Sequence, residues 1–285
     1  MGFRHVLVTG TSRGIGRATA FRLASAGMSV LAGVRNPDDV EAIARDARSR
    51  VTPIVLDISR EDSIERAAET VRSTVGREGL FALVNSAADT SRGSPMEYVS
   101  RETLERAFGV AAFGTFSLIR ALLPMLRLAR GRIVNVGAGR LPLPLLGPGF
   151  GAKFAMESMS DVLRVELRKT GVKVSIVEPG MTRWDDVDEQ LAAYARALDD
   201  ALCDVRAEDR ARYENAALRF KALNRRMMAT AAPAERVAAT IERALTAPRP
   251  RARYHCGWEQ KAASWMERLT TERFRDRVVG RMTGL

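Results

Sequence analysis

The sequence predicts a doubly wound α/β fold, in which helices cover both faces of a parallel sheet, and three observations support this prediction. Short apolar segments alternate with longer segments whose apolar residues have helical spacing, from residue 5 to residue 180. The apolar segments are nearly continuous, as expected of strands buried on both faces. A glycine-rich turn, TGTSRGIG, joins the first strand to the first helix. With 285 residues, 46% of them hydrophobic, the chain can bury one core of this kind.

The predicted elements follow one another in alternation. HVLVTG forms the first strand, and GIGRATAFRLASAGM follows it with helical spacing. Nearly continuous apolar runs predict strands over 5–10, 29–34, 52–57, 81–86, 131–137 and 172–180. Helical spacing predicts the intervening helices over 14–28, 38–47, 61–76, 101–128 and 151–169.

The alternation ends after EPGMTRWDD. Residues 185–230 are charged and helical in composition, and they are too long for an ordinary connection, so we expect an inserted helical lid or substrate-binding segment. PAERVAATIERALTA (233–247) has a proline and a glutamate at its start, which predicts a helix. RARYHCG (251–257) predicts an edge strand. The basic, amphipathic tail (261–282) should pack on the domain or on a partner subunit, with membrane contact as the alternative.

This pattern divides one domain into three parts. We expect residues 1–184 to form the core, 185–232 the lid segment, and 233–285 the helix, edge strand and tail that complete the same domain.

Composition and charge exclude several classes of function. The net charge of +11 is spread along the whole chain, and all but five of the 45 basic residues are arginines, so we do not expect nucleic-acid binding. The two cysteines and two histidines fit no metal-binding spacing. We find no apolar run approaching the roughly 20 residues of a membrane span and no secretion signal, so we expect a cytoplasmic protein with free thiols.

The glycine-rich turn predicts a nucleotide site. Gly10, Gly14 and Gly16 lie between a strand and a helix, where glycine lets the chain turn tightly. It also lets a pyrophosphate approach the backbone and the helix N-terminus. A lone glycine pattern is weak evidence, but this one is followed by further strand–helix units of a parallel sheet.

Five motifs in order resemble the short-chain dehydrogenase/reductase family: TGTSRGIG, LDIS (56–59), LVNSAA (83–88), KFAMESMS (153–160) and VEPG (177–180). The resemblance covers residues 4 to about 184. From Pro233 onward the chain is similar to the subgroup near 17β-hydroxysteroid and retinol dehydrogenases. The resemblance implies a Rossmann fold, oxidoreductase activity on a small-molecule substrate, and homodimers or homotetramers formed through helices 101–128 and 151–169.

The residues near the glycine turn favour NADP(H). An NAD-selecting protein places an acid about 20 residues beyond the turn, but here Arg35 occupies that point and the next acid is Asp38. Arg13 adds a second cation, and two arginines can hold a 2′-phosphate; the alternative is that both are solvated surface charges. Together with the resemblance, this assigns the cofactor to Thr9, Gly10, Ser12, Arg13, Gly14, Ile15, Gly16, Arg35, Asp57, Ile58, Asn85, Ala87, Lys153, Pro179, Gly180 and Thr182.

The family's catalytic tetrad is incomplete. The resemblance implies an Asn, a Ser, a Tyr and a Lys that bind and protonate the substrate carbonyl. Here Ala111, Ala138 and Gly149 stand at the first three places, and Lys153 alone remains. Loss of one oxyanion donor typically costs about 100–1,000-fold in rate, and loss of a general acid roughly 100–10,000-fold. An ordinary ketoreductase is therefore disfavoured.

Three functional hypotheses remain open. The first is hydride transfer to an acceptor that needs no tyrosine, such as an iminium ion, a quinone-like compound or a bulky polycyclic substrate. The second is a non-redox cyclase, isomerase or dehydratase on the same fold. The third is an inactive, NADP(H)-sensing or partner subunit. Candidates to replace the missing acid, each with an ordinary surface or loop role as the alternative, are Asp89, Arg140, Tyr194 and Tyr213.

Overall fold

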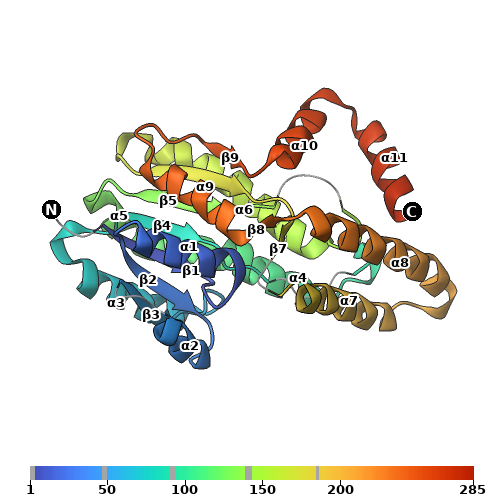
Figure 1. The fold of residues 1–285 in the computed structure, drawn as a ribbon, viewed down its shortest axis with the longest axis horizontal. Coiled ribbons are helices and arrows are strands. Elements are labelled where there is room, and N and C mark those ends of the chain that lie inside the picture. Colours follow the sequence, from blue (N-terminus) through green and yellow to red (C-terminus); the bar gives the residue numbers. More distant parts are fainter. Residues whose placement is uncertain (1–3, 47–49, 90–93, 139–142, 184–185) are drawn as a thin grey trace.

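A computed structural model of the protein describes residues 4–46, 50–89, 94–138, 143–183 and 186–285. It contains a central sheet with helices on both faces and a helical extension to one side (Figure 1). The doubly wound α/β prediction is confirmed.

The central sheet has seven parallel strands in the order β3-β2-β1-β4-β5-β6-β9. Their bounds are β1 His5–Thr9, β2 Ser29–Val34, β3 Val51–Val55, β4 Ala82–Asn85, β5 Arg132–Val136, β6 Lys173–Glu178 and β9 Arg253–His255. The chain winds outward in one direction from β1 to β3 and then returns to β4 on the other side of β1. In open α/β sheets, ligands bind in the crevice beyond the carboxyl ends of the strands at such a switch point.

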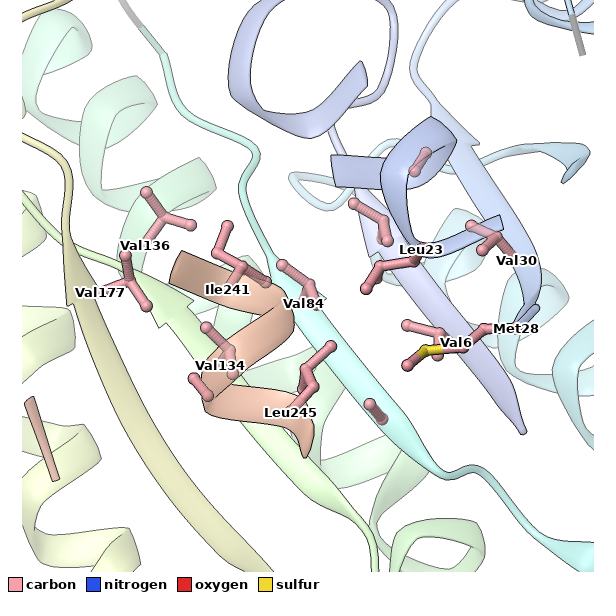
Figure 2. Close-up of a cluster of buried hydrophobic side chains, with 14 of the residues drawn as sticks. Val6, Leu23, Met28, Val30, Val84, Val134, Val136, Val177, Ile241 and Leu245 are labelled. Carbon is pink, nitrogen blue, oxygen red and sulfur yellow. The ribbon is translucent and has the colours of Figure 1, made fainter. Parts of the chain in front are cut away.

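Two hydrophobic clusters cover the two faces of the sheet because successive strand residues point to opposite sides. One cluster includes residues of helix α1 (Gly14–Ser25), helix α2 (Asp38–Asp46) and helix α9 (Ala234–Thr246). Figure 2 shows part of this cluster, including Val6, Leu23 and Leu245. Helices α3 (Glu61–Val75) and α5 (Thr115–Leu128) cover the other face.

The expected helix over 101–128 contains an interruption. Helix α4 (Arg101–Phe108) passes through a π-helical stretch, Gly109–Gly114, before α5 begins. At its end, a Cβ on Gly114 would overlap the backbone carbonyl of Ile58, so only glycine permits this approach. By length and composition alone the whole run could cross a bilayer, which we did not expect. Half of its most apolar window is buried in the protein.

The predicted insertion consists mostly of two helices. It leaves the domain at β7 (Thr182–Arg183) and returns at β8 (Ala232–Pro233), and these two short strands pair with each other. Between them, α7 (Val187–Cys203) and α8 (Ala207–Thr230) form a hairpin beside the sheet (Figure 1).

The C-terminal part confirms the predicted helix and edge strand. Strand β9 adds to the sheet beside β6, and helices α10 (Trp258–Leu269) and α11 (Glu272–Thr283) follow. Helix α11 contacts α8 of the insertion, so the tail packs on the protein itself. Figure 1 shows these two helices away from the sheet.

Helix α6 (Gly147–Glu166) begins four residues earlier than predicted, with Pro148 in its first turn. Two carboxylates of α6 and one of β6 contact one arginine of the edge strand. Arg253 donates to buried Glu157 of α6 (2.7 Å), to Asp161 of α6 (2.7 Å) and to buried Glu178 of β6 (2.9 Å). Burial lowers the pKa of Arg253, but the hydrogen bonds to these carboxylates more than offset it and raise the pKa overall. Edge strand, β6 and α6 are thus held by one guanidinium.

We expect Arg253→Met to lower the free energy of unfolding by about 3–5 kcal/mol at pH 7, because it leaves buried carboxylates without a counter-charge. Urea unfolding at pH 7 measures the loss. Arg251→Met, which removes an exposed arginine nearby, is the control; an equal loss in both variants would contradict this role.

Candidate functional site

The glycine turn lies at the carboxyl end of β1, at the switch point of the sheet. Gly10 and Gly14 have positive φ angles of 68° and 59°. A Cβ on Gly10 would lie 2.8 Å from the Cα of Ala87, and a Cβ on Gly16 would overlap the carbonyl of Gly10. Glycine is therefore required both by backbone conformation and by close packing of the turn against the end of β4. Ile15, next to Gly16, packs against the core.

Two polar residues of this turn and one arginine after the next strand are exposed. Ser12 and Arg13 are exposed just before the N-terminus of α1, and Arg35 is exposed just after β2. Helix α1 has no acidic residue in its first turn, so its positive end is not neutralised locally. The structure thus brings two cations to the ends of neighbouring strands at an open helix N-terminus.

Two residues assigned to the cofactor bond inward through their side chains. Thr9 is buried, and its hydroxyl accepts the backbone N–H groups of Ser86 and Ala87, both at 3.1 Å. Asn85 is also buried and donates to the side chain of Asn135 (2.7 Å), which in turn donates to Ser160 of α6 (2.8 Å). These hydrogen bonds connect the ends of β1, β4 and β5 to one another and to α6.

The turn after β3 is also ordered by its own side chains. The Asp57 carboxylate accepts the backbone N–H (2.9 Å) and the hydroxyl (2.7 Å) of Ser59. Ile58 is buried, and its carbonyl faces Gly114 of the π-helical stretch. These contacts fix the turn that the resemblance assigns to the adenine end of the nucleotide.

The turn after β6 meets the insertion and the C-terminal helices. Gly180 has a φ of 68°, and a Cβ there would lie 2.8 Å from the Cγ of Gln260 on α10. Buried Pro179 precedes it. The carbonyl of buried Thr182 accepts a hydrogen bond from buried Gln190 of α7 (3.0 Å). Gln190 and Gln260 had no motif in the sequence, because only the packing of distant helices brings them to this turn.

Lys153 reaches the carboxyl end of β5 from α6. Its ammonium donates to the carbonyl of Val136 at 2.8 Å. Burial lowers the pKa of Lys153 to about 8, and the negative charge of Glu157, one turn along the helix, opposes this shift. At neutral pH the ammonium is therefore charged but close to its titration range.

The three other places that the resemblance assigns to the tetrad hold small residues. Gly149 lies one turn before Lys153 on the same helix, and a Cβ there would have 4.0 Å to the nearest outside atom, the carbonyl oxygen of Asp89. Ala111, in the π-helical stretch, is buried in a cluster with Ala152. Ala138 follows β5, and its backbone N–H donates to Glu157 (3.3 Å). None of these three side chains can donate or accept a hydrogen bond.

The candidate acids lie in different surroundings. Asp89 pairs with Arg106 of α4 (2.9 Å). The Tyr213 hydroxyl donates to Glu97, so this tyrosine fastens α8 to the segment before α4. Tyr194 of α7 lies close enough to feel the charge of Arg13; burial raises its pKa, while Arg13 and a hydrogen bond with Gln190 oppose the rise. Arg140 lies outside the described residues.

An apolar cavity opens between the segment before α6 and the C-terminal helices. Carbon-rich side chains from α8, α10 and α11 form most of its wall. The lining residues are Leu143, Leu223, Met266, Arg275, Val278, Val279, Met282 and Thr283. Leu143 lies six residues before Gly149, and α10 carries both Met266 and Gln260, so the elements that bound the cavity also reach the turns around the predicted reaction site.

Comparisons with solved structures agree with this geometry. A short-chain dehydrogenase from Streptomyces avermitilis has a TM-score of 0.73 at 25% identity, with 98% of each chain covered. A metagenomic short-chain oxidoreductase in complex with NADP has a TM-score of 0.59 at 28% identity, covering 66% of this chain and 89% of that chain.

Sequence comparisons extend the likeness. Residues 4–194 match the short chain dehydrogenase family model. Retinol dehydrogenase 5 of Mus musculus is 34% identical over 265 residues, covering 90% of this chain and 81% of the relative. Short-chain dehydrogenase/reductase family 9C member 7 of Homo sapiens is 31% identical over 265 residues, covering 90% of this chain and 83% of the relative. The chain belongs to the short-chain dehydrogenase/reductase family of oxidoreductases, in its retinol dehydrogenase-like subgroup.

Proposed function

We propose that this protein is an NADP(H)-dependent oxidoreductase that transfers hydride to an acceptor which needs no tyrosine acid. One observation carries the proposal: Lys153 is held at the end of β5, on the same sheet edge as the glycine turn after β1, while the other three places that the resemblance assigns to the tetrad hold no polar side chain. The proposed site for a hydride donor and a catalytic site without proton-donating side chains then lie on the same edge of the sheet.

The residues around the switch point fit a dinucleotide. The close approach of Gly10 to Ala87 and of Gly16 to Gly10 leaves the backbone of the turn bare for a pyrophosphate. The exposed guanidinium groups of Arg13 and Arg35 suit the 2′-phosphate of NADP(H). The metagenomic relative solved with NADP supports the same choice. When bound, the reduced nicotinamide supplies the hydride, and Lys153 and the turn after β6 hold that end of the cofactor.

The missing hydrogen-bond and proton donors indicate which class of hydride acceptor suits the site. Ala138 and Gly149 cannot bind or protonate a developing alkoxide, so a carbonyl would gain little from this site. An iminium or quinone-like acceptor needs no such donor at the moment of transfer. We infer a bulky, apolar substrate because Ala138 and Gly149 leave room beside Lys153 and offer it no polar side chain. Relatives named retinol dehydrogenase are consistent with a substrate of that character.

We expect isothermal titration to show micromolar or tighter binding of NADPH and at least 10-fold weaker binding of NADH. Arg13→Ala and Arg35→Ala should each weaken NADPH binding roughly 10-fold, about 1.4 kcal/mol, because each removes a charge-assisted hydrogen bond to the 2′-phosphate. Neither change should alter NADH binding.

Arg77→Ala is the matched control, since it removes an exposed arginine that precedes β4, at the opposite end of the strands. Absence of dinucleotide binding by the unaltered protein at millimolar concentration would refute the redox proposal. Equal losses in all three variants would refute the specific role of Arg13 and Arg35.

A tyrosine can be introduced at Gly149, the position that the resemblance assigns to the catalytic tyrosine. The 4.0 Å clearance at Gly149 admits a Cβ, and Ala138 already carries one, so Gly149→Tyr with Ala138→Ser should fold. We expect this double variant to reduce apolar ketones or aldehydes with NADPH at least 100-fold faster than the unaltered protein, because it restores a general acid and an oxyanion donor. NADPH oxidation followed by absorbance measures the rate. Gly149→Phe with Ala138→Ser, which lacks the phenolic hydroxyl, is the control; equal rates would contradict the prediction.

We further propose that the protein forms a homodimer or homotetramer through α5 and α6. Large apolar side chains on this side are exposed in the single chain: Phe113, Leu128, Val162 and Val165. We expect multi-angle light scattering to give a multiple of the chain mass. Val165→Glu, which places a charge in this surface, should yield monomer, and a monomeric unaltered protein would refute the proposal.

A further inference from the structure

The carboxylate of Glu157 is buried beside the predicted reaction site without belonging to the family tetrad. Glu157 is 1% exposed and lies one helical turn after Lys153 on α6. One of its oxygens accepts the backbone N–H of Ala138 (3.3 Å). A Cβ on Gly137 would overlap that same oxygen, so the carboxylate fills the space that the glycine leaves.

Lys153 and Glu157 therefore both form hydrogen bonds with the backbone at the end of β5. Lys153 binds the carbonyl of Val136, and Glu157 binds the N–H two residues further along the chain. Both side chains extend from the same face of α6, and their hydrogen bonds hold this helix against the end of β5. A shift of the carboxylate would displace the backbone to which the ammonium is bound.

The other charged groups nearby are already engaged. Arg253 of β9 shares its guanidinium among Glu157, Asp161 of α6 and Glu178 of β6. The Nδ1 atom of His255 lies 2.8 Å from the second oxygen of Glu178. Glu157 is thus tied to Arg253 through one oxygen, and its other oxygen is directed toward the end of β5.

We infer that Glu157 is a positioning residue for Lys153, whose buried carboxylate keeps the neighbouring ammonium charged and directed at the end of β5. A buried ammonium without a nearby anion tends to lose its proton. The charge of Glu157 acts against the effect of burial on Lys153. This inference rests on the proposed function only in that Lys153 is taken to serve the dinucleotide.

The direct test measures the titration of Lys153 without any cofactor. Trace acetylation with acetic anhydride between pH 6 and 10, read by mass spectrometry, gives the reactivity of Lys153 relative to exposed Lys173. We expect a midpoint near pH 8 in the unaltered protein and a shift to lower pH in Glu157→Gln, because the effect of burial on Lys153 is then no longer opposed by this negative charge.

Asp161→Asn is the matched control. It removes a second carboxylate from the same Arg253 and the same helix, but two turns from Lys153, so the midpoint should stay near pH 8. A purely structural role for Glu157 predicts no lowering of the midpoint, or an equal lowering in both variants, and either result would overturn the inference. Should Glu157→Gln not fold, Glu157→Asp keeps the charge one methylene further back and should lower the midpoint. An equal or higher midpoint would then overturn the inference.

A second readout separates this inference from the proposed function. Binding of NADPH should weaken as the pH rises through about 8, where Lys153 loses its charge, and Glu157→Gln should move this limb to lower pH. Failure of the unaltered protein to bind NADPH would refute the proposed function, while the acetylation result would still decide the role of Glu157. Normal binding with the same limb in both proteins would refute the role of Glu157 alone.

Discussion

The carboxyl edge of the sheet depends on one guanidinium. Arg253, on a strand of only three residues, binds acidic side chains from α6 and β6 and so joins the last two strands to the helix that carries Lys153. Two of its partners are buried, so neither the arginine nor the acids can be lost alone without leaving an unpaired charge. The edge strand and the predicted reaction site are consequently parts of one electrostatic unit.

The same edge of the sheet carries two contrasting groups of residues. The turn after β1 contains Gly10 and Gly16, at which a Cβ would clash with the neighbouring backbone. The positions that the resemblance assigns to the family's Asn, Ser and Tyr hold no side chain that can form a hydrogen bond, and one of them, Ala111, packs with Ala152 of α6. The proposed function rests on this contrast.

The helical insertion and the C-terminal helices complete this site from outside the sheet. Gln190 of α7 and Gln260 of α10 both reach the turn after β6, one through Thr182 and the other over Gly180. Tyr213 fastens the insertion to the segment before α4. The apolar cavity lies between α8, α10, α11 and Leu143, so segments that carry no family motif form its wall.

The sequence by itself determined the fold and the order of its strands and helices, because both depend on the local periodicity of apolar residues. It also determined the place of the glycine turn after β1, because positive φ angles and close backbone packing there require glycine. The assignment of Lys153 and of the three tetrad places to Ala111, Ala138 and Gly149 stays a prediction from the resemblance. Only the tertiary structure showed that Thr9 and Asn85 bond inward, that Tyr213 fastens the insertion, and that Glu157 lies beneath Lys153. The contacts of Arg253 with Glu157 and Glu178 join residues more than 70 positions apart, and no local pattern marks such a pairing. It arises when the edge strand docks beside β6, which brings the arginine to carboxylates that burial would otherwise leave uncompensated.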